Sequence, residues 1–228
     1  MAELTILVPV YNEAATIASV MRALTELWGD AEIIYIDDGS KDDSLRILKE
    51  NARPRDIVLT KPNGGKGSAI RLGLEKGSSP FTVIQDADLE YDPSEIRLLL
   101  ADAKANSGCA VFGSRFLKPN PNLYKRYLLG NKVMTGITNM LFHARLTDSY
   151  TCYKLFPTDL MRSLPLTARG FELEAELCAY PLKKGVTIRE IPISYKPRSL
   201  EEGKKIRFRD AWKGMKTLLK IRFSRAAT

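Results

Sequence analysis

Short apolar runs alternate with longer amphipathic stretches along the first half of the chain. The runs are rich in β-branched residues and predict buried strands at 4–10, 32–36, 56–59, 81–85 and 109–113. Between the first two, apolar residues recur at helical spacing over 13–28. This alternation of strand and helix predicts an α/β fold with a mostly parallel sheet covered on both faces.

Polar residues mark where the helices of this half begin. Ser40 is typical of an N-cap, with Asp43 three residues on, and the turn 63–67 precedes a helix that reaches Glu75. The segment 92–95 (DPSE) combines a cap, a proline in the first turn and a glutamate at the third position, which predicts another helix start.

The rhythm changes after about residue 115. The pattern there predicts helices at 128–142 and 173–183, strands at 149–156 and 187–194, a polar loop at 196–203 and a basic helix to the end. We therefore expect one domain over 1–203, divided into halves 1–114 and 115–203, and a basic amphipathic helix over 204–228.

Charge divides the same two halves. The 228 residues include 35 basic and 27 acidic ones, a net charge of +8. Residues 1–114 hold 12 basic and 18 acidic residues (−6), whereas 115–228 hold 23 and 9 (+14). A basic half attracts polyanions such as nucleic acid, anionic lipid or phosphorylated substrates, whereas acidic clusters favour a divalent cation. Both halves are also compatible with ordinary solvated surface.

Composition excludes several classes. Hydrophobic residues make up 44% and charged residues 27%, which argues against disorder. The three cysteines are far apart and the single histidine is His143, so a disulfide scaffold, a structural zinc site and a histidine triad are disfavoured. The sequence shows no basic leader and no long apolar stretch, so it predicts neither a secretory signal nor a membrane span. The predicted location is the cytoplasm.

Candidate chemistry lies at the carboxyl ends of the predicted strands, where open parallel sheets bind ligands. Three polar clusters fall there: 9–13 (PVYNE), 37–40 (DDGS) and 86–90 (DADLE). Asp86 and Asp88 are two residues apart, so their carboxylates can point the same way and hold a hard cation, with Glu90 close enough to complete the shell. Capping of a following turn is the alternative for the same residues.

Two phosphate-binding motifs are absent. In the segment 64–68 (GGKGS), Gly67 follows Lys66, so the G-K-[ST] ending of a P-loop is missing. The segment 65–70 lacks the third glycine of the dinucleotide fingerprint. A P-loop NTPase and a dehydrogenase are disfavoured, and Lys66 is expected mainly to open a helix, although it could approach a phosphate.

Eight short motifs occur in an order that resembles a known family. They are PVYNE, IDDGS, NGGKG, QDADLE, GSRF, TDSYTCYKLF, EIPISY and EGKK, from about residue 4 to residue 212. The set resembles the inverting family-two glycosyltransferases of the GT-A fold, and more narrowly the dolichyl- or polyprenyl-phosphate mannose and glucose synthases. No single motif is specific, but their order is.

The resemblance implies a role for each matching residue. Donor-binding residues would be Pro9, Tyr11, Glu13, Ile36, Asp38, Asp86, Ala87, Asp88, Arg115, Arg198 and Lys204. Metal ligands for Mg²⁺ or Mn²⁺ would be Asp86, Asp88 and Glu90, although relatives often carry glutamine at the Glu90 position. Asp88 and Arg115 would be catalytic. Cys152 replaces the glycine of many relatives, and a small buried residue is the usual explanation for a free cysteine.

The implied reaction transfers a hexose from a UDP- or GDP-sugar to a polyprenyl phosphate with inversion. A phosphate acceptor is mostly dianionic at neutral pH and needs no strong base. A saccharide or other lipid acceptor is the alternative, and it would need a base such as Asp148 or Glu172. Glu174 and Glu176 stay ambiguous, because acidic residues are common in the first turn of a helix.

The basic end of the chain favours a membrane surface. Residues 204–225 hold nine Lys or Arg and one acid, with Phe208, Trp212, Met215 and Leu219 on one face. Such a helix is typical of an interfacial element, but the same face could equally pack on the domain core. Residues 124–142 mix basic and apolar residues in a similar way. We expect a peripheral protein on the inner membrane face, with a separate membrane protein as a candidate partner.

Other classes fit less well. A nucleic-acid-binding protein would account for the basic tail but not for carboxylate clusters at strand ends, so no nucleic acid is expected. A sugar-nucleotidyltransferase should have a glycine-rich loop where PVYNE stands. A non-catalytic relative is disfavoured by the presence of both Asp86 and Asp88.

Overall fold

A computed structural model describes residues 2–120, 125–197 and 208–224. Within these ranges the strands form one seven-stranded sheet of order β3-β2-β1-β4-β6-β5-β7. The strands are β1 (Leu4–Val10), β2 (Glu32–Asp37), β3 (Ile57–Thr60), β4 (Phe81–Ile84), β5 (Ala110–Ser114), β6 (Lys154–Pro157) and β7 (Ile188–Pro192). β6 is antiparallel to both of its neighbours and the other pairs are parallel. The predicted α/β class and mostly parallel sheet are confirmed.

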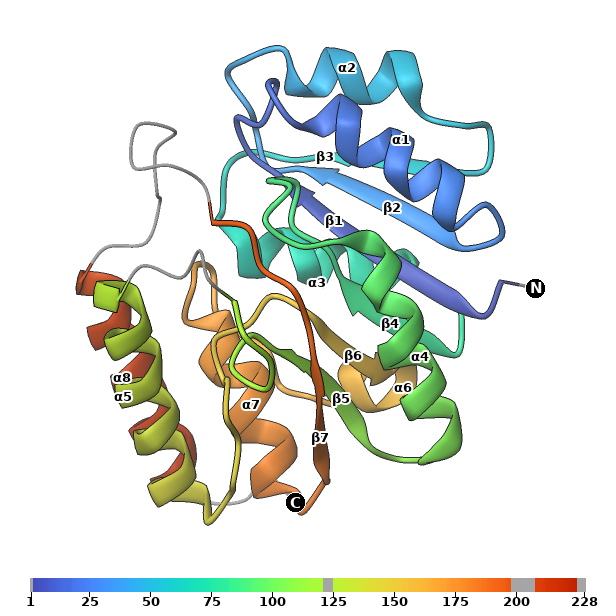
Figure 1. Cartoon of the computed structure of the whole chain (residues 1–228). Helices are drawn as coiled ribbons and strands as arrows, with labels where there is room; N and C mark the ends of the chain where they lie inside the picture. Colours follow the sequence, from blue (N-terminus) through green and yellow to red (C-terminus); the bar gives the residue numbers. More distant parts are fainter. Residues whose placement is uncertain (1, 121–124, 198–207, 225–228) are drawn as a thin grey trace.

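Helices cover both faces of the sheet, with α1 and α4 in front of it and α3 behind it (Figure 1). The helices are α1 (Ile17–Leu27), α2 (Ser44–Asn51), α3 (Lys66–Lys76), the 3-10 turn η1 (Pro93–Glu95), α4 (Ile96–Ala105), α5 (Lys125–Phe142), α6 (Thr158–Arg162), α7 (Leu173–Lys183) and α8 (Phe208–Phe223). Each covered strand is buried on two faces, which explains why the strands are continuous apolar runs.

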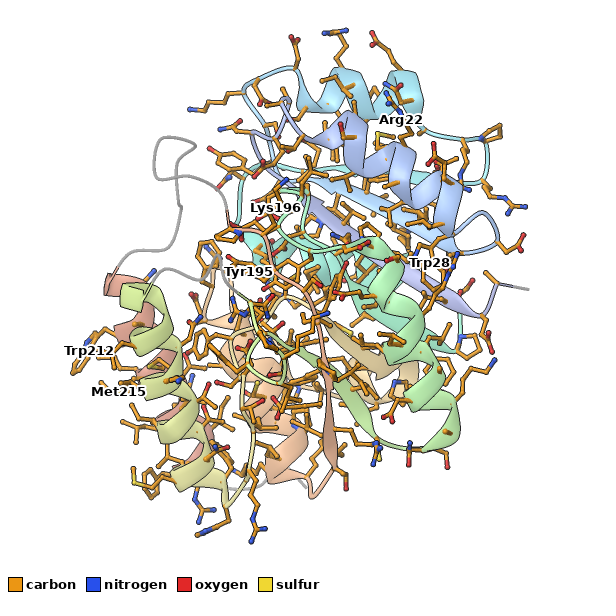
Figure 2. All side chains as sticks on the ribbon, viewed as in Figure 1. Arg22, Trp28, Tyr195, Lys196, Trp212 and Met215 are labelled. Carbon is orange, nitrogen blue, oxygen red and sulfur yellow. The ribbon has the colours of Figure 1, made fainter. Side chains whose placement is uncertain are left out.

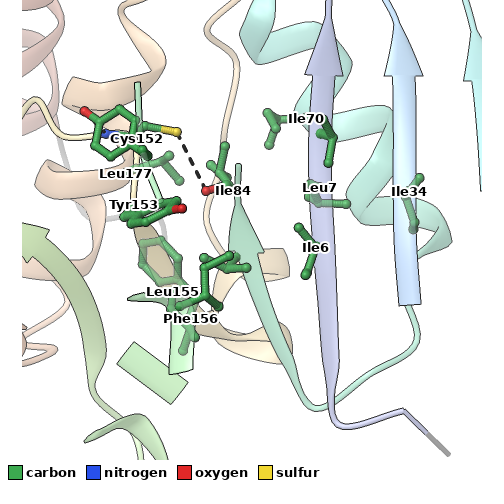
Figure 3. Packing of buried hydrophobic residues seen from close by; sticks show 14 of the residues in the cluster. Ile6, Leu7, Ile34, Ile70, Ile84, Cys152, Tyr153, Leu155, Phe156 and Leu177 are labelled. Atoms are coloured by element: carbon green, nitrogen blue, oxygen red, sulfur yellow. Dashed lines mark hydrogen bonds between the residues drawn. The ribbon is translucent and has the colours of Figure 1, made fainter. Parts of the chain in front are cut away.

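The core lies between the sheet and these helices. Ile6, Leu7 and Ile34 are fully buried on β1 and β2, and Ile70 of α3 packs against them (Figure 3). Tyr153 precedes β6 and is fully buried in the same cluster. This core fixes the direction of β1, β2 and β4, so the polar residues that follow them meet at one edge of the sheet.

α8 lies beside α5 at one side of the molecule and also packs on α7 (Figure 1). Met134 of α5, Ala175 and Ala179 of α7, and Leu218 and Ile221 of α8 form a second buried cluster. A Cβ at Gly214 would come within 2.2 Å of the Tyr150 hydroxyl, so the helix approaches closely there. The face of α8 that packs on the protein carries Leu218 and Ile221, whereas Trp212 and Leu219 of the predicted apolar face are exposed, so the expectation that this face packs on the core is not met for them.

Several elements of the structure differ from the sequence prediction. The predicted strand 149–156 is shortened to β6, which begins at Lys154. The carbonyl oxygens of Tyr150 and Thr151 accept hydrogen bonds from the side chains of Arg115 and Lys154 rather than from the backbone of a neighbouring strand. The short helix α6 was not predicted. α1 begins at Ile17 rather than residue 13, after a turn in which Thr16 and Ile17 donate to the Glu13 carbonyl. In the described part of the chain, no helix has the length and apolarity needed to cross a bilayer.

Candidate functional site

The loops after β1 and β2 are joined by hydrogen bonds. Asn12, which has a positive φ of 54°, donates its N–H to Ser40 Oγ at 3.0 Å. Its side-chain oxygen accepts from the Lys41 N–H at 2.8 Å, and the Glu13 N–H donates to Ser44 Oγ at 2.8 Å. Ser40 thus binds the neighbouring loop, and the N-cap position of α2 belongs to Asp43, so the predicted cap at Ser40 is wrong.

A third strand end meets these two. The Thr16 hydroxyl donates to the Ala87 carbonyl at 2.7 Å, which ties the start of α1 to the segment after β4. Pro9, Tyr11 and Glu13 are partly exposed at this edge, and Ala87 is buried. The structure therefore brings the PVYNE and DADLE segments together, as the strand order β2-β1-β4 requires.

Asp38 faces the glycine turn that precedes α3. Its Oδ1 accepts from Gly64 N at 2.9 Å and from Lys61 Nζ at 2.6 Å, and its Oδ2 accepts from Gly65 N at 2.7 Å. The buried carboxylate thus shapes the turn. Ile36 is fully buried, and a Cβ at Gly73 of α3 would collide with it. Its side chain belongs to the core and does not reach the sheet edge.

Asp86 takes part in a buried network that crosses between the two halves of the chain. Its Oδ1 lies 2.8 Å from Lys66 Nζ, and the same ammonium lies 3.0 Å from Glu174 Oε1 on α7. The other Glu174 oxygen accepts from Lys154, which is fully buried and also donates to the Thr151 carbonyl. We call Lys66, Asp86, Lys154 and Glu174 the lysine–carboxylate network. Two cations balance two anions within it.

The surroundings of this network shift the pKa values of Asp86 and of the neighbouring Cys152. Burial opposes the ionisation of Asp86, but the Lys66 ammonium outweighs it and holds the pKa of Asp86 below its usual value. Burial, with the Asp86 carboxylate nearby, raises the pKa of the Cys152 thiol. Cys152 is buried and directs its sulfur to the Ile84 carbonyl at 3.7 Å (Figure 3). A small, uncharged, buried cysteine is confirmed at this position.

Asp88 and Glu90 follow Asp86 but point to different partners. Asp88 Oδ1 accepts from the Glu90 N–H at 3.2 Å, and Glu90 Oε2 accepts from the Tyr195 hydroxyl at 2.7 Å. Over the residues that the structure describes, no three carboxylate, thiol or imidazole groups gather in a cluster of the kind that holds a metal. The pair Asp86 and Asp88 still offers only carboxylate oxygens, the donors that Mg²⁺ and Mn²⁺ prefer, at a partly exposed strand end.

Arg115 is buried in an ion pair. Its Nε and Nη2 lie 2.7 and 2.8 Å from the two oxygens of Asp148, and Nη2 also donates to the Tyr150 carbonyl at 3.1 Å. The guanidinium stacks over the Tyr195 ring at 5.1 Å. Glu190 in turn accepts from the backbone N–H groups of Thr147 and Asp148. Asp148 is fully buried in this pair, which makes it a poor base for a saccharide acceptor.

Sequence patterns assigned no clear role to some residues of this arrangement, and two of the predicted site residues lie outside the part of the chain that the structure describes. Tyr195 links Glu90 to Arg115, and although it ends the EIPISY motif, no role was predicted for it from the sequence. Glu174 was left ambiguous and proves to be the link to Lys66, whereas Glu176 caps the backbone of Thr167 and Ala168. Arg198 and Lys204 lie outside the described residues.

Comparisons with known proteins agree with one another. The family model described as glycosyl transferase family 2 matches residues 5–164. The glycosyltransferase AglJ of Haloferax volcanii is 30% identical over 195 residues, 85% of this chain and 63% of that protein. The dolichyl-phosphate beta-glucosyltransferase of Saccharomyces cerevisiae is 28% identical over 221 residues, 84% of this chain and 66% of that protein. The chain thus spans less than two thirds of the length of each of these relatives.

A solved structure has the same fold. Glucosyl-3-phosphoglycerate synthase from Mycobacterium tuberculosis, in complex with Mn²⁺, uridine diphosphate and phosphoglyceric acid, superposes with a TM-score of 0.77 at 20% identity. The superposition covers 99% of this chain and 80% of that one.

Proposed function

This chain belongs to glycosyl transferase family 2, and from that premise we propose that it transfers a hexose from a UDP- or GDP-sugar to a polyprenyl phosphate, with inversion at C1. The observation that carries the acceptor is the alignment, over 84% of this chain, with a relative named for a dolichyl-phosphate acceptor. The fully buried ion pair of Asp148 supports the same acceptor, because a phosphate oxygen can attack without a protein base.

The donor would lie along the edge formed by the ends of β1, β2 and β4. Pro9, Tyr11 and Glu13 are partly exposed there and could line the base and ribose. Ile36 and Asp38 would act from beneath, since Ile36 is in the core and Asp38 holds the glycine turn. Ala87 would contribute its backbone, which Thr16 already fixes.

Asp86 and Asp88 would hold a divalent cation, with Glu90 nearby. A bound Mg²⁺ or Mn²⁺ would neutralise charge on the departing nucleoside diphosphate. The Mn²⁺ in the structurally similar synthase supports a divalent ion without deciding between the two metals. Asp86 also pairs with Lys66, so a metal would share its carboxylate with that ammonium.

Arg115 would supply positive charge beside the acceptor phosphate, and Asp148 fixes the plane of its guanidinium. Arg198 and Lys204 would add charge on the donor side, on a segment outside the description. These cations would stabilise the negative charge on the attacking acceptor phosphate and on the departing diphosphate, which lie on opposite sides of C1 in the transition state.

We further propose that α5 and α8 place the protein on the inner face of the membrane. Their outer sides expose the apolar residues Leu129, Val133, Met140, Trp212, Leu219 and Phe223. Trp212 points away from the body of the molecule (Figure 2). Lys132, Lys213, Lys216 and Lys220 are exposed beside them, which is the composition of an interfacial surface attracted to anionic lipid.

A nucleotide-release assay tests the transfer reaction. Purified protein is mixed with Mn²⁺ or Mg²⁺ and a panel of UDP- and GDP-sugars, each with and without a polyprenyl phosphate. We expect release that depends on the lipid with one preferred donor, and its loss in Asp88→Ala. Donor-dependent release with a saccharide in place of the lipid would replace the acceptor. No release with any donor would refute the proposal.

Vesicle sedimentation tests the membrane surface. Trp212→Ser should reduce binding to vesicles that contain anionic lipid, because it removes the large apolar side chain from the exposed face of α8. Leu98→Ser is the matched control, since Leu98 is 51% exposed on α4 and Trp212 is 52% exposed. Equal binding of both variants would contradict a role for α8.

A further inference from the structure

The contacts of the Lys66 side chain are not needed to begin α3, and they are unlike those of an ordinary surface lysine. Its side chain is only 13% exposed, and its ammonium lies between Asp86 Oδ1 at 2.8 Å and Glu174 Oε1 at 3.0 Å. An ammonium paired with two carboxylates thus sits directly on a carboxylate to which the proposed function assigns a metal.

The surroundings hold this cation in place. Glu174 comes from α7, on the far side of the sequence, and its second oxygen is anchored by Lys154. The backbone beside Lys66 is also fixed, since the Gly67 N–H donates to the Arg169 carbonyl at 2.8 Å. A Cβ at Gly65 or Gly67 would lie 2.3 Å from a backbone oxygen of the 168–169 segment, so the close packing depends on glycine. The backbone that carries Lys66 and the carboxylates that hold its ammonium are therefore both fixed by other contacts.

The charges around Asp86 determine how strongly this strand end attracts a free metal ion. The lysine–carboxylate network is neutral as a whole, so Asp86 offers a free cation little net attraction. A dication that reached Asp86 would also be repelled by an ammonium one carboxylate away. A nucleoside diphosphate changes this balance, because its oxygens supply both negative charge and ligands.

We propose that Lys66 is a positioning residue that holds one oxygen of Asp86 and keeps the affinity of the donor-free protein for a divalent cation low, so that the cation enters together with the diphosphate. This inference rests on the proposed function for the assignment of the metal to Asp86 and Asp88. Glu174 shares the task, because it holds Lys66 against Asp86.

Mn²⁺ binding to the full chain tests this role of Lys66 directly. The amount of bound metal is measured from the decrease in the electron paramagnetic resonance signal of the free ion. Without nucleotide, Lys66→Met should bind Mn²⁺ about tenfold or more tightly than the unmodified protein, because a repelling charge is removed. Lys66→Arg keeps the charge and should not gain affinity. With UDP present, the difference between Lys66→Met and the unmodified protein should narrow.

A matched control is available on the same glycine turn. Lys61 is 18% exposed and pairs with Asp38 rather than Asp86, so Lys61→Met removes an equal charge without freeing an Asp86 oxygen. Its Mn²⁺ affinity should stay close to that of the unmodified protein. Circular dichroism confirms that each variant is folded, and a merely structural role of Lys66 would lower Mn²⁺ affinity rather than raise it.

The outcomes separate the two levels of inference. If Lys66→Met is folded and binds Mn²⁺ no more tightly, while Asp88→Ala abolishes binding in the presence of UDP, the role of Lys66 is wrong and the metal site stands. If Lys61→Met gains as much as Lys66→Met, the effect is one of net charge, and the specific contact is refuted. If Asp88→Ala binds Mn²⁺ as well as the unmodified protein, both inferences fall.

Discussion

Two ion-pair arrangements lie near the same sheet edge and differ in how closed they are. Arg115 and Asp148 have side chains that are 7% and 0% exposed, and two hydrogen bonds join them. Lys66 and Asp86 are 13% and 24% exposed, and the lysine is shared with a second carboxylate. The first pair is almost closed to solvent, whereas the second leaves one carboxylate partly available to a ligand. Burial, rather than the presence of an ion pair, separates the two roles.

Breaking the closed pair should have the largest effect. Asp148→Ala leaves the Arg115 guanidinium buried without its partner, which should lower the free energy of unfolding by about 3–5 kcal/mol. Urea denaturation followed by circular dichroism measures this. The double variant Arg115→Met/Asp148→Leu should recover part of the loss, and a single variant as stable as the unmodified protein would show that the pair is not structural.

Breaking the open network should cost less. Lys66→Met removes the hydrogen bonds to two carboxylates but leaves Asp86 partly exposed and Glu174 paired with Lys154, so a loss of about 1–3 kcal/mol is expected. The same urea titration gives the value. A loss equal to that of Asp148→Ala would remove the distinction between the two arrangements.

The pH dependence of stability should show a smaller effect near the closed pair. Burial, with a contribution from the Asp148 carboxylate, raises the pKa of Glu190 above 4.5, against the opposing hydrogen bonds from Thr147 and Asp148. A raised carboxyl pKa stabilises the fold below the unfolded pKa, and this contribution is lost as the pH rises through the folded pKa. Unfolding free energies measured upward from pH 4 should therefore fall more steeply for the unmodified protein than for Glu190→Gln.

An exposed ion pair gives the lower limit of the series. Arg46 and Glu50 lie one turn apart on α2, and Arg46 Nη1 is 2.9 Å from Glu50 Oε2. Both side chains are more than half exposed. Because water screens such a pair, Glu50→Gln should leave the urea midpoint within error of the unmodified protein. A clear loss would mean that exposure is a poor guide to the strength of these contacts.

Local sequence patterns predicted most of the fold. The bounds of β1 and α7 match the predicted ranges, because each is a clear run of apolar or helical positions. The strand predicted at 149–156 failed because the pattern records that Thr151, Cys152 and Tyr153 are buried, but not which groups bind their backbone. In this segment the carbonyl oxygens of Tyr150 and Thr151 accept hydrogen bonds from Arg115 and Lys154. Only the final residues of the segment pair with β4 and β5.

The candidate site was harder to predict than the fold. Asp86, Asp88 and Arg115 stand out because each follows a strand within a recognisable motif. Lys66 and Glu174 lie 108 residues apart, and no local spacing connects them. Likewise, Asp148 and Arg115 were both noticed, but only the structure shows that each neutralises the other. Residue types can be read one at a time, whereas pairing depends on how the chain returns to the same place.

The contact between the glycine turn and the 168–170 segment has a consequence for biosynthesis. Gly67 donates its N–H to Arg169, and Asp86 shares Lys66 with Glu174, so the sheet edge built by the first ninety or so residues is finished by residues made much later. A nascent chain released from the ribosome before residue 174 would carry the DADLE segment with Lys66 held from one side only. The order of synthesis therefore delays completion of this sheet edge until the second half of the protein has emerged.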